Sequence, residues 1–278
     1  MAFGQSTSSR DNSLGFTLIE LLIVISVVLV LVSMLLPTIS RVKENARNTY
    51  CLNNLRQINI TWQLYSVDND KLVANGFQNE GPHPENPYWV QGYLNHLLSR
   101  DLTNNILLLD NRYALFGDYL KMAKIYKCPS DKILFPLIGT PSTKVQKHRS
   151  YSLNWHLGMR EDRREFKKEF DMEFRERYLI LKENNIINPE STITFIGVHP
   201  ESICWPVFGI NGDNSVFMYP SSAHSGRGNV AFADNHVISK KWLDLRTKTG
   251  SANWHIHFDY SFDNLDFVWL KGKRGVNF

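Results

Sequence analysis

Residues 15–36 read GFTLIELLIVISVVLVLVSMLL, and this stretch decides the architecture of the chain. Its one ionisable side chain is Glu20. A helix over residues 16–36, rising about 1.5 Å per residue, is roughly 31 Å long, which matches the hydrocarbon thickness of a bilayer. The sequence therefore predicts a transmembrane helix over residues 16–36, directly after Gly15.

The rest of the chain has the composition of a globular domain. Of its 278 residues, 43% are hydrophobic and 21% are charged, so we expect an ordered head with its own core. The net charge of +4 comes from 31 basic and 27 acidic residues, without the long basic run that follows phosphates. We therefore expect membrane lipid as a partner of the apolar segment, and no nucleic acid.

The helical pattern continues beyond the apolar segment, over residues 37–68. Pro37 lies inside the pattern and predicts a kink or a local opening. The run Asp68-Asn69-Asp70 predicts the helix end, and a cation site is the alternative interpretation of its carboxylates. The head, residues 69–278, should pack on a face of apolar side chains that recur at steps of three to five residues: Ile39, Val42, Ala46, Tyr50, Leu55, Ile58, Trp62 and Tyr65.

Apolar and alternating runs predict β-strands in the head. Residues 192–198 indicate a buried strand, and residues 229–233 and 236–240 indicate a hairpin joined by the two-residue turn Asp234-Asn235. Asparagine tolerates the positive φ that such a turn requires. Aromatic residues at every fourth position predict an amphipathic helix within residues 160–183. The expected fold class is α+β, with a long N-terminal helix packed on an antiparallel sheet.

The residues from Gly15 to Ile25 resemble the prepilin cleavage and methylation signature of type IV pilins and type II secretion pseudopilins. In that family a membrane-embedded peptidase cuts after the glycine and methylates the new N-terminus. The resemblance implies that residues 1–15 are a cleaved leader, that Phe16 becomes the N-methylated first residue, and that Glu20 serves subunit assembly. Elementary electrostatics agrees, because a carboxylate among apolar helices is costly unless it meets a partner such as the new α-amine.

The same resemblance implies partners and a location. The partners are a prepilin peptidase/methyltransferase, other pilin-like subunits and an inner-membrane assembly platform. The chain would be a single-pass inner-membrane protein with an exported C-terminal head, assembled into a periplasmic or surface filament.

Scattered motifs of the head resemble pilin-like proteins that carry a C-terminal H-X9-DG domain. They are residues 51–58 (CLNNLRQI), 128–131 (CPSD) and 150–154 (SYSLN), together with His224, nine intervening residues and Asp234. Asn235 stands where that family has glycine. A structural hydrogen-bonding or turn role is the favoured interpretation of His224 and Asp234, and a catalytic or metal-binding pair is the alternative.

The three cysteines would face an oxidising compartment if the head is exported. We pair Cys51 with Cys128, because both lie in the family-like motifs and Cys51 lies on the part of the helix that the head should cover. Cys204 is then free. Loop oxygens at Asn211, Asp213 and Asn214 are candidate calcium ligands, with a polar turn as the favoured interpretation.

The sequence contains no nucleophile elbow, phosphate loop or convincing carboxylate dyad, so we do not predict an enzyme and expect no cofactor apart from the calcium alternative. The leading function is that of a structural subunit of a type II secretion-like or type IV pilus-like filament. A second interpretation is a membrane-tethered protein whose aromatic-rich head binds carbohydrate or another surface polymer. A third is an anchored hydrolase that uses His224 and Asp234.

Overall fold

The computed structural model describes residues 16–76, 82–95, 97, 100–158, 180–250 and 257–276. The leader, residues 1–15, lies outside this range, as does most of the helix predicted within residues 160–183. The chain divides into two compact units, Met1–Glu44 and Asn45–Phe278.

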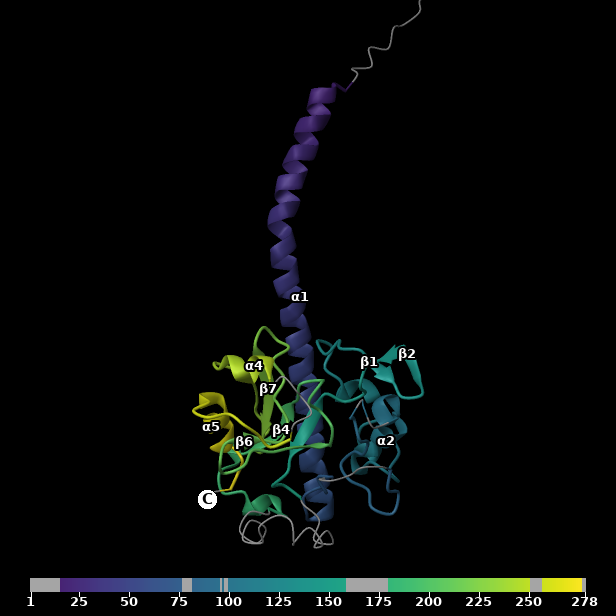
Figure 1. Cartoon of the computed structure of the whole chain (residues 1–278), viewed down its shortest axis with the longest axis vertical. Coiled ribbons are helices and arrows are strands. Elements are labelled where there is room, and N and C mark those ends of the chain that lie inside the picture. Colours follow the sequence, from purple (N-terminus) through teal and green to yellow (C-terminus); the bar gives the residue numbers. More distant parts are fainter. Residues whose placement is uncertain are drawn as a thin grey trace, which may run out of the picture. The chain divides into compact units, whose positions relative to one another are not determined.

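One helix, α1 (Leu18–Asn69), contributes to both units, which confirms the predicted long N-terminal helix (Figure 1). It continues unbroken through Pro37. In residues 18–36 every large hydrophobic side chain is at least 43% exposed, around the whole circumference of the helix. This segment is long and apolar enough to cross a membrane.

From Cys51 onward, α1 buries one face within the second unit. The buried positions follow a helical spacing and include Cys51, Leu55, Ile58, Trp62 and Tyr65. The sequence analysis was wrong to extend this face toward the N-terminus, because four of its predicted positions are exposed: Ile39, Val42, Ala46 and Tyr50. The buried stripe passes through Cys51 and leaves Tyr50 beside it.

The helix ends where the sequence predicted. α1 stops at Asn69, and Asp70 follows with a φ of 52°, a conformation that breaks the helix. The flanking carboxylates have protein partners: Asp68 accepts a hydrogen bond from the Tyr119 hydroxyl at 2.8 Å, and Asp70 pairs with Lys182 at 2.6 Å. These contacts favour the helix stop over a cation site.

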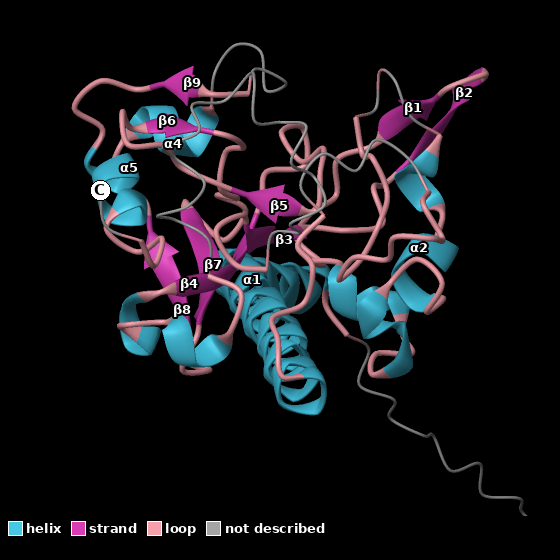
Figure 2. Ribbon diagram, turned by 90° about the horizontal axis from the view of Figure 1, so that it is seen from below, coloured by secondary structure: helices cyan, strands magenta, loops and turns pink. Residues whose placement is uncertain are grey.

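A five-stranded sheet with the order β5-β3-β4-β7-β8 forms the centre of the second unit (Figure 2). Its pairs are antiparallel except for β3 with β5, which is parallel. Its strands are β3 (Tyr151–Asn154), β4 (Ile193–Gly197), β5 (Val207–Phe208), β7 (Arg227–Phe232) and β8 (Val237–Lys241). The α+β class with a mainly antiparallel sheet is thereby confirmed.

Strand β4 shows that both faces of the sheet pack against hydrophobic cores. All five of its residues are buried, as its continuous apolar sequence predicted. Phe195 packs in the core that contains Leu55, Ile58 and Trp62 of α1. Ile193 and Ile196 pack in a second core, together with Trp242 and Phe267. The sheet therefore separates two hydrophobic layers.

Short elements complete the second unit. Two small sheets pair β1 (Phe135–Leu137) with β2 (Thr140–Val145), and β6 (Ser215–Val216) with β9 (Asp259–Tyr260). The short helices are η1 (Asp101–Thr103), α2 (Ile106–Leu109), η2 (Leu115–Asp118), η3 (Ala123–Tyr126), η5 (Glu183–Asn185), η6 (Pro189–Ser191), α4 (Leu245–Thr249) and α5 (Leu265–Lys271).

Candidate functional site

Glu20 takes part in a capping box at the start of α1. Its Oε2 accepts hydrogen bonds from the Thr17 backbone N–H at 2.9 Å and from the Thr17 hydroxyl at 2.7 Å. The Thr17 Oγ1 in turn accepts from the Glu20 N–H at 3.3 Å. A threonine and a glutamate three residues apart satisfy the first amides of a helix in this reciprocal way.

The sequence analysis singled out Glu20 and missed Thr17, although the T-x-x-E spacing before an apolar run was available as a signal. Both capping contacts fall on Oε2, and the described residues supply no partner for Oε1. Phe16 lies immediately before the cap and is 71% exposed. The other processing residue, Gly15, lies outside the described residues.

His224 and Asp234 of the predicted H-X9-D motif lie at opposite ends of β7. The six residues of this strand span roughly 20 Å at about 3.3 Å per residue. Asp234 contacts the Nδ1 of His236 at 2.5 Å, whereas His224 is buried beside Cys128. The interpretation of His224 and Asp234 as a catalytic or metal-binding pair is therefore wrong, because β7 holds them apart.

The hairpin between β7 and β8 has a longer turn than predicted. Phe232 and His236 are joined by a backbone hydrogen bond, so Ala233, Asp234 and Asn235 form a three-residue loop rather than a two-residue turn. Asn235 has a φ of 72°, as its place in the turn required. Such a loop, ending in a left-handed residue, fits the right-handed twist of the strands.

Asn235 adopts a positive φ, and its side chain also makes hydrogen bonds. Its Oδ1 accepts a hydrogen bond from Asn59 Nδ2 at 2.8 Å, and its amide donates to Gln63 Oε1. Both partners belong to α1. The side chain of Asn235 therefore links the hairpin to α1.

The loop proposed as a calcium site is organised as a turn. Asp213 accepts from the Ser215 amide at 2.8 Å, and the Asn211 side chain donates to the Ser215 hydroxyl at 2.9 Å. Asn214 has a φ of 68°. The Lys271 ammonium donates to the Gly212 carbonyl, which brings a positive charge to the oxygens that calcium would need. The contacts favour the polar turn.

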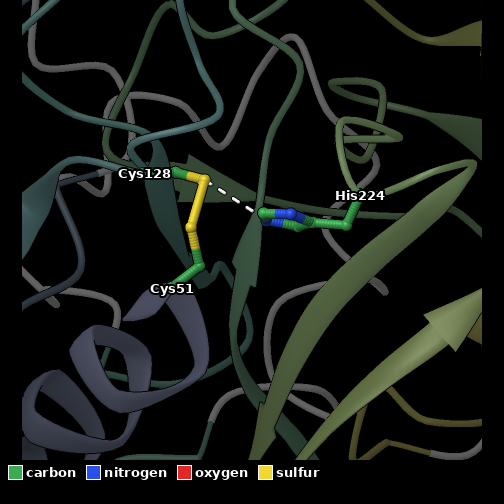
Figure 3. Close-up of side chains that lie close together, drawn as sticks. All are labelled: Cys51, Cys128 and His224. Atoms are coloured by element: carbon green, nitrogen blue, oxygen red, sulfur yellow. Dashed lines mark hydrogen bonds between the residues drawn. A yellow bond between two sulfur atoms is a disulfide. The ribbon is translucent and has the colours of Figure 1, made fainter. Parts of the chain in front are cut away.

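A disulfide joins Cys51 of α1 to Cys128, which follows η3 (Figure 3). Cys204 is buried and takes no part in the disulfide. Burial raises the pKa of the Cys204 thiol to about 11. The Cys51–Cys128 bond closes a loop with a sequence separation of 77 residues. Closing a loop of this size stabilises a fold by about 4 kcal/mol in the chain-entropy model.

His224 approaches the disulfide from the segment before β7. Its Nε2 lies 3.3 Å from Cys128 Sγ. Figure 3 marks this contact with a dashed line. The two sulfurs and this nitrogen all lie within 4.8 Å of one another, and all three residues are buried. Within the described ranges, no other histidine, cysteine and carboxylate side chains cluster at metal-ligand distances. The sequence analysis paired the two cysteines, but nothing in the sequence placed His224 beside them, because 96 residues separate His224 from Cys128.

Beside the cluster lies a second polar group of the head, the buried carboxylate of Asp131. Its Oδ2 accepts from the Ser150 hydroxyl at 2.7 Å and from Lys127 Nζ. Its Oδ1 is buried and has no hydrogen-bond partner among the described residues. Asp131 lines a cavity of about 10 Å³ together with Cys51, Cys128 and His224.

Comparison with known proteins concerns the N-terminal part of the chain. Residues 10–36 match the model of the prokaryotic N-terminal methylation motif. The matched segment is similar to the N-terminus of proteins that carry this methylation motif. The chain is also 34% identical over 64 residues to the type IV wide pilus major component PilA4 of Thermus thermophilus. That similarity covers 23% of this chain and 49% of the relative, so the chain spans about half the length of the relative it matches. No solved structure matches the chain.

Most described aromatic side chains of the head are buried, although Tyr260 and Phe262 are 53% and 65% exposed, with ring centroids 6.3 Å apart. Among the described residues no tryptophan is exposed, and Trp62, Trp89 and Trp242 are completely buried. Stacking on sugar rings requires accessible aromatic faces. The aromatic content that suggested a carbohydrate-binding head is explained mainly by its two hydrophobic cores.

Proposed function

We propose that the chain is a structural subunit of a type IV pilus-like or type II secretion-like filament. One observation carries the proposal: the exposed apolar segment of α1, residues 18–36, lies within the matched N-terminal methylation motif, residues 10–36. Such a helix, hydrophobic around its whole circumference, requires an apolar environment on every side. Lipid supplies this environment before assembly, and the helices of neighbouring subunits supply it in the filament.

The proposal includes processing and location. A prepilin peptidase/methyltransferase cuts between Gly15 and Phe16 and methylates the Phe16 amine. Before assembly, the precursor is a single-pass inner-membrane protein with an exported head, and an inner-membrane platform passes it into the filament. The spacing of His224 and Asp234, and the motifs at residues 51–58 and 128–131, support placing the head with the H-X9-DG pilin-like proteins.

Glu20 is the residue on which assembly depends. The capping box occupies Oε2 and leaves Oε1 without a partner among the described residues. An ionised carboxylate in a bilayer costs at least about 2.5 kcal/mol. A salt bridge from Oε1 to the Phe16 amine of a neighbouring subunit offsets this cost only after cleavage has produced that amine. Cleavage and assembly are thereby coupled.

The processing step is tested by mass spectrometry of the N-terminus in sheared filaments. We expect a chain that begins with N-methylated Phe16, and a precursor that accumulates in membranes when Gly15 is replaced by leucine. Assembled filaments whose subunits still carry Met1 would contradict the proposal.

The role of Glu20 is tested with two substitutions that separate the cap from the charge. Glutamine can keep the capping-box hydrogen bonds without the charge, whereas leucine loses both. We expect Glu20→Gln and Glu20→Leu to be cleaved normally and to be incorporated into sheared filaments at least tenfold less than wild type. Normal incorporation of Glu20→Gln, without wild-type subunits present, would show that the cap rather than the charge matters.

A further inference from the structure

The Cys51–Cys128–His224 cluster has the composition and size of a site for a thiophilic divalent cation. We propose that, once its disulfide is reduced, the chain binds one Zn²⁺-class ion through Cys51 Sγ, Cys128 Sγ and His224 Nε2. Asp131 lines the same cavity but lies outside this close group, and its Oδ1 would move in as the fourth ligand. The cluster then has two exclusive states, a disulfide and a metal centre.

Ligand geometry supports the proposal. Zinc bonds of about 2.3 Å to sulfur and about 2.0 Å to nitrogen place tetrahedral donors roughly 3.6 to 3.8 Å apart. His224 Nε2 already lies 3.3 Å from Cys128 Sγ, and all three donor atoms lie within 4.8 Å. After reduction, the two sulfur atoms only have to move apart from their bonded distance. The backbones of α1, the segment after η3 and the segment before β7 already hold these three donor atoms close together.

The fourth ligand follows from the buried carboxylate beside the cluster. Asp131 lines the same small cavity, and its Oδ1 has no partner in the described part of the chain. A buried carboxylate oxygen without a hydrogen bond is costly, and a cation in the cavity would remove that cost. Its other oxygen is held by Ser150 and Lys127, which fix the orientation of the carboxylate as outer partners of metal ligands do.

The charges also balance. Two thiolates and one carboxylate carry three negative charges, and Zn²⁺ together with the Lys127 ammonium supplies three positive charges. Lys127 Nζ contacts Asp131 Oδ2 at 2.5 Å, so this compensation is local. A buried site without net charge avoids the large penalty for burying an unpaired ion.

The change from the disulfide to the metal-bound state requires a reductant, and a dithiol can supply the electrons. Thiol–disulfide exchange transfers two electrons and two protons to the Cys51–Cys128 bond, and the dithiol becomes a disulfide. The cation then replaces the proton on each of the two thiols, so two protons are released on binding. In the reverse direction, an oxidised dithiol (a disulfide) accepts two electrons and two protons, the Cys51–Cys128 bond forms again, and the divalent cation is released.

The test uses the full chain in detergent, without a polyhistidine tag, and Co²⁺ and Zn²⁺ as probes. The chain is reduced with a phosphine and freed of metal with a chelator. We expect one Co²⁺ per reduced chain, with thiolate-to-cobalt charge-transfer absorption and the visible bands of tetrahedral cobalt. The oxidised chain should show neither. Binding of equal strength to the oxidised chain, or none to the reduced chain, would overturn the proposal.

Variants identify the ligands. His224→Gln should weaken Zn²⁺ binding at least tenfold in competition with a chelator, and Asp131→Asn should weaken it to a smaller extent. Cys204→Ser and His236→Gln are matched controls that remove a cysteine and a histidine outside the cluster, and both should bind as wild type does. Unchanged Zn²⁺ affinity in His224→Gln, or lost affinity in Cys204→Ser, would refute the proposed set of ligands. Unchanged affinity in Asp131→Asn would show that Asp131 is not a ligand.

Alkylation of the reduced wild-type chain gives a result that does not depend on how a variant folds. Zn²⁺ should protect Cys51 and Cys128 from a maleimide, and removal of the ion by a chelator should restore their labelling. Equal labelling with and without Zn²⁺ would overturn the proposal.

Discussion

Asn235 shows how one side chain can serve both a turn and a tertiary contact. Its backbone has the positive φ that ends the β7–β8 loop, and its side chain contacts Asn59 and Gln63 of α1. The turn propensity was visible in the sequence, because asparagine is common at positive φ. The contact with α1 was not, because 176 residues separate Asn235 from Asn59.

Two substitutions separate these roles of Asn235. Asn235→Gly keeps the turn and removes the side-chain hydrogen bonds, which should lower the free energy of unfolding by about 1–2 kcal/mol. Asn235→Ala loses the same bonds and adds the strain of a positive φ, so its loss should be larger by about 1 kcal/mol. Urea unfolding of the full chain in detergent measures both. Equal stability of glycine variant and wild type would show that the contacts with α1 contribute nothing.

Arg149 is a buried cation that the sequence did not mark as special. It lies in a Lys147-His148-Arg149 run, which by composition suggests a surface, yet its side chain is completely buried. Its guanidinium lies 5.9 Å from the ring of Trp89, and its three nitrogens have no hydrogen-bond partner in the described residues. Burying such a group costs stability.

Arg149→Met should therefore raise the free energy of unfolding by about 1–3 kcal/mol, since methionine fills a similar volume without a charge. Arg112→Met is the matched control, because Arg112 is exposed and pairs with Asp110; its effect should stay within about 1 kcal/mol. Both are compared by urea unfolding. A loss of stability in Arg149→Met would mean that the guanidinium has a favourable partner, such as a bound anion.

At the scale of elements, α1 is one helix with two surfaces of different kinds. Residues 18–36 expose apolar side chains all round, whereas the face through Cys51, Leu55 and Trp62 packs against the sheet. Both halves were predictable, because a continuous apolar run and a helical period are local patterns. The neighbours of the buried face could not be predicted, since contacts among β3, β4 and β7 depend on strand order.

A fragment that begins at Asn45 should therefore fold without the apolar segment. It keeps every buried position of α1, from Cys51 to Ser66, and coincides with the second compact unit. We expect one cooperative thermal transition by circular dichroism. A fragment that begins at Asp70 lacks the buried face of α1 and should show none. A non-cooperative transition in the longer fragment would contradict an independent head.

The candidate site shows the limit of sequence reasoning more clearly than the fold does. The pair Cys51 and Cys128 was proposed from family-like motifs, and the structure joins them. His224 was noted for its spacing to Asp234, but β7 separates those two residues, and His224 instead lies against Cys128 from 96 residues away. A motif gives the spacing of two residues along the sequence. Whether their side chains come into contact depends on the structure of the segment between them, here the strand β7.

At the scale of the whole molecule, buried histidines make stability depend on pH. Burial lowers the pKa of His148 to about 3, helped by the nearby Arg149 charge, and burial lowers the pKa of His199 to about 4, helped by Lys147. In the unfolded chain a histidine titrates near pH 6.5. As the pH falls below about 6.5, the unfolded state therefore takes up protons that the folded state cannot, and stability decreases.

We expect each of these histidines to reduce the free energy of unfolding by about 1.4 kcal/mol per pH unit between about pH 6 and pH 4. Urea unfolding of the full chain at pH 7, 6 and 5 measures the slope. His148→Gln should remove the contribution of His148 from the slope of the free energy of unfolding against pH. His83→Gln, an exposed control, should leave this slope unchanged. A slope that His148→Gln does not alter would mean that His148 is protonated in the folded chain.

The bond between Cys51 and Cys128 has a mechanical consequence for a filament subunit. Tension along a filament pulls on the helix of each subunit, and contacts made by packing alone can yield by sliding. Sliding by one turn would move the helix about 5.4 Å past its neighbours. A covalent link between the helix and the rest of the head forbids that movement until a sulfur–sulfur bond breaks. In the proposed filament, subunits assembled under reducing conditions should therefore unfold their heads at lower force than oxidised ones.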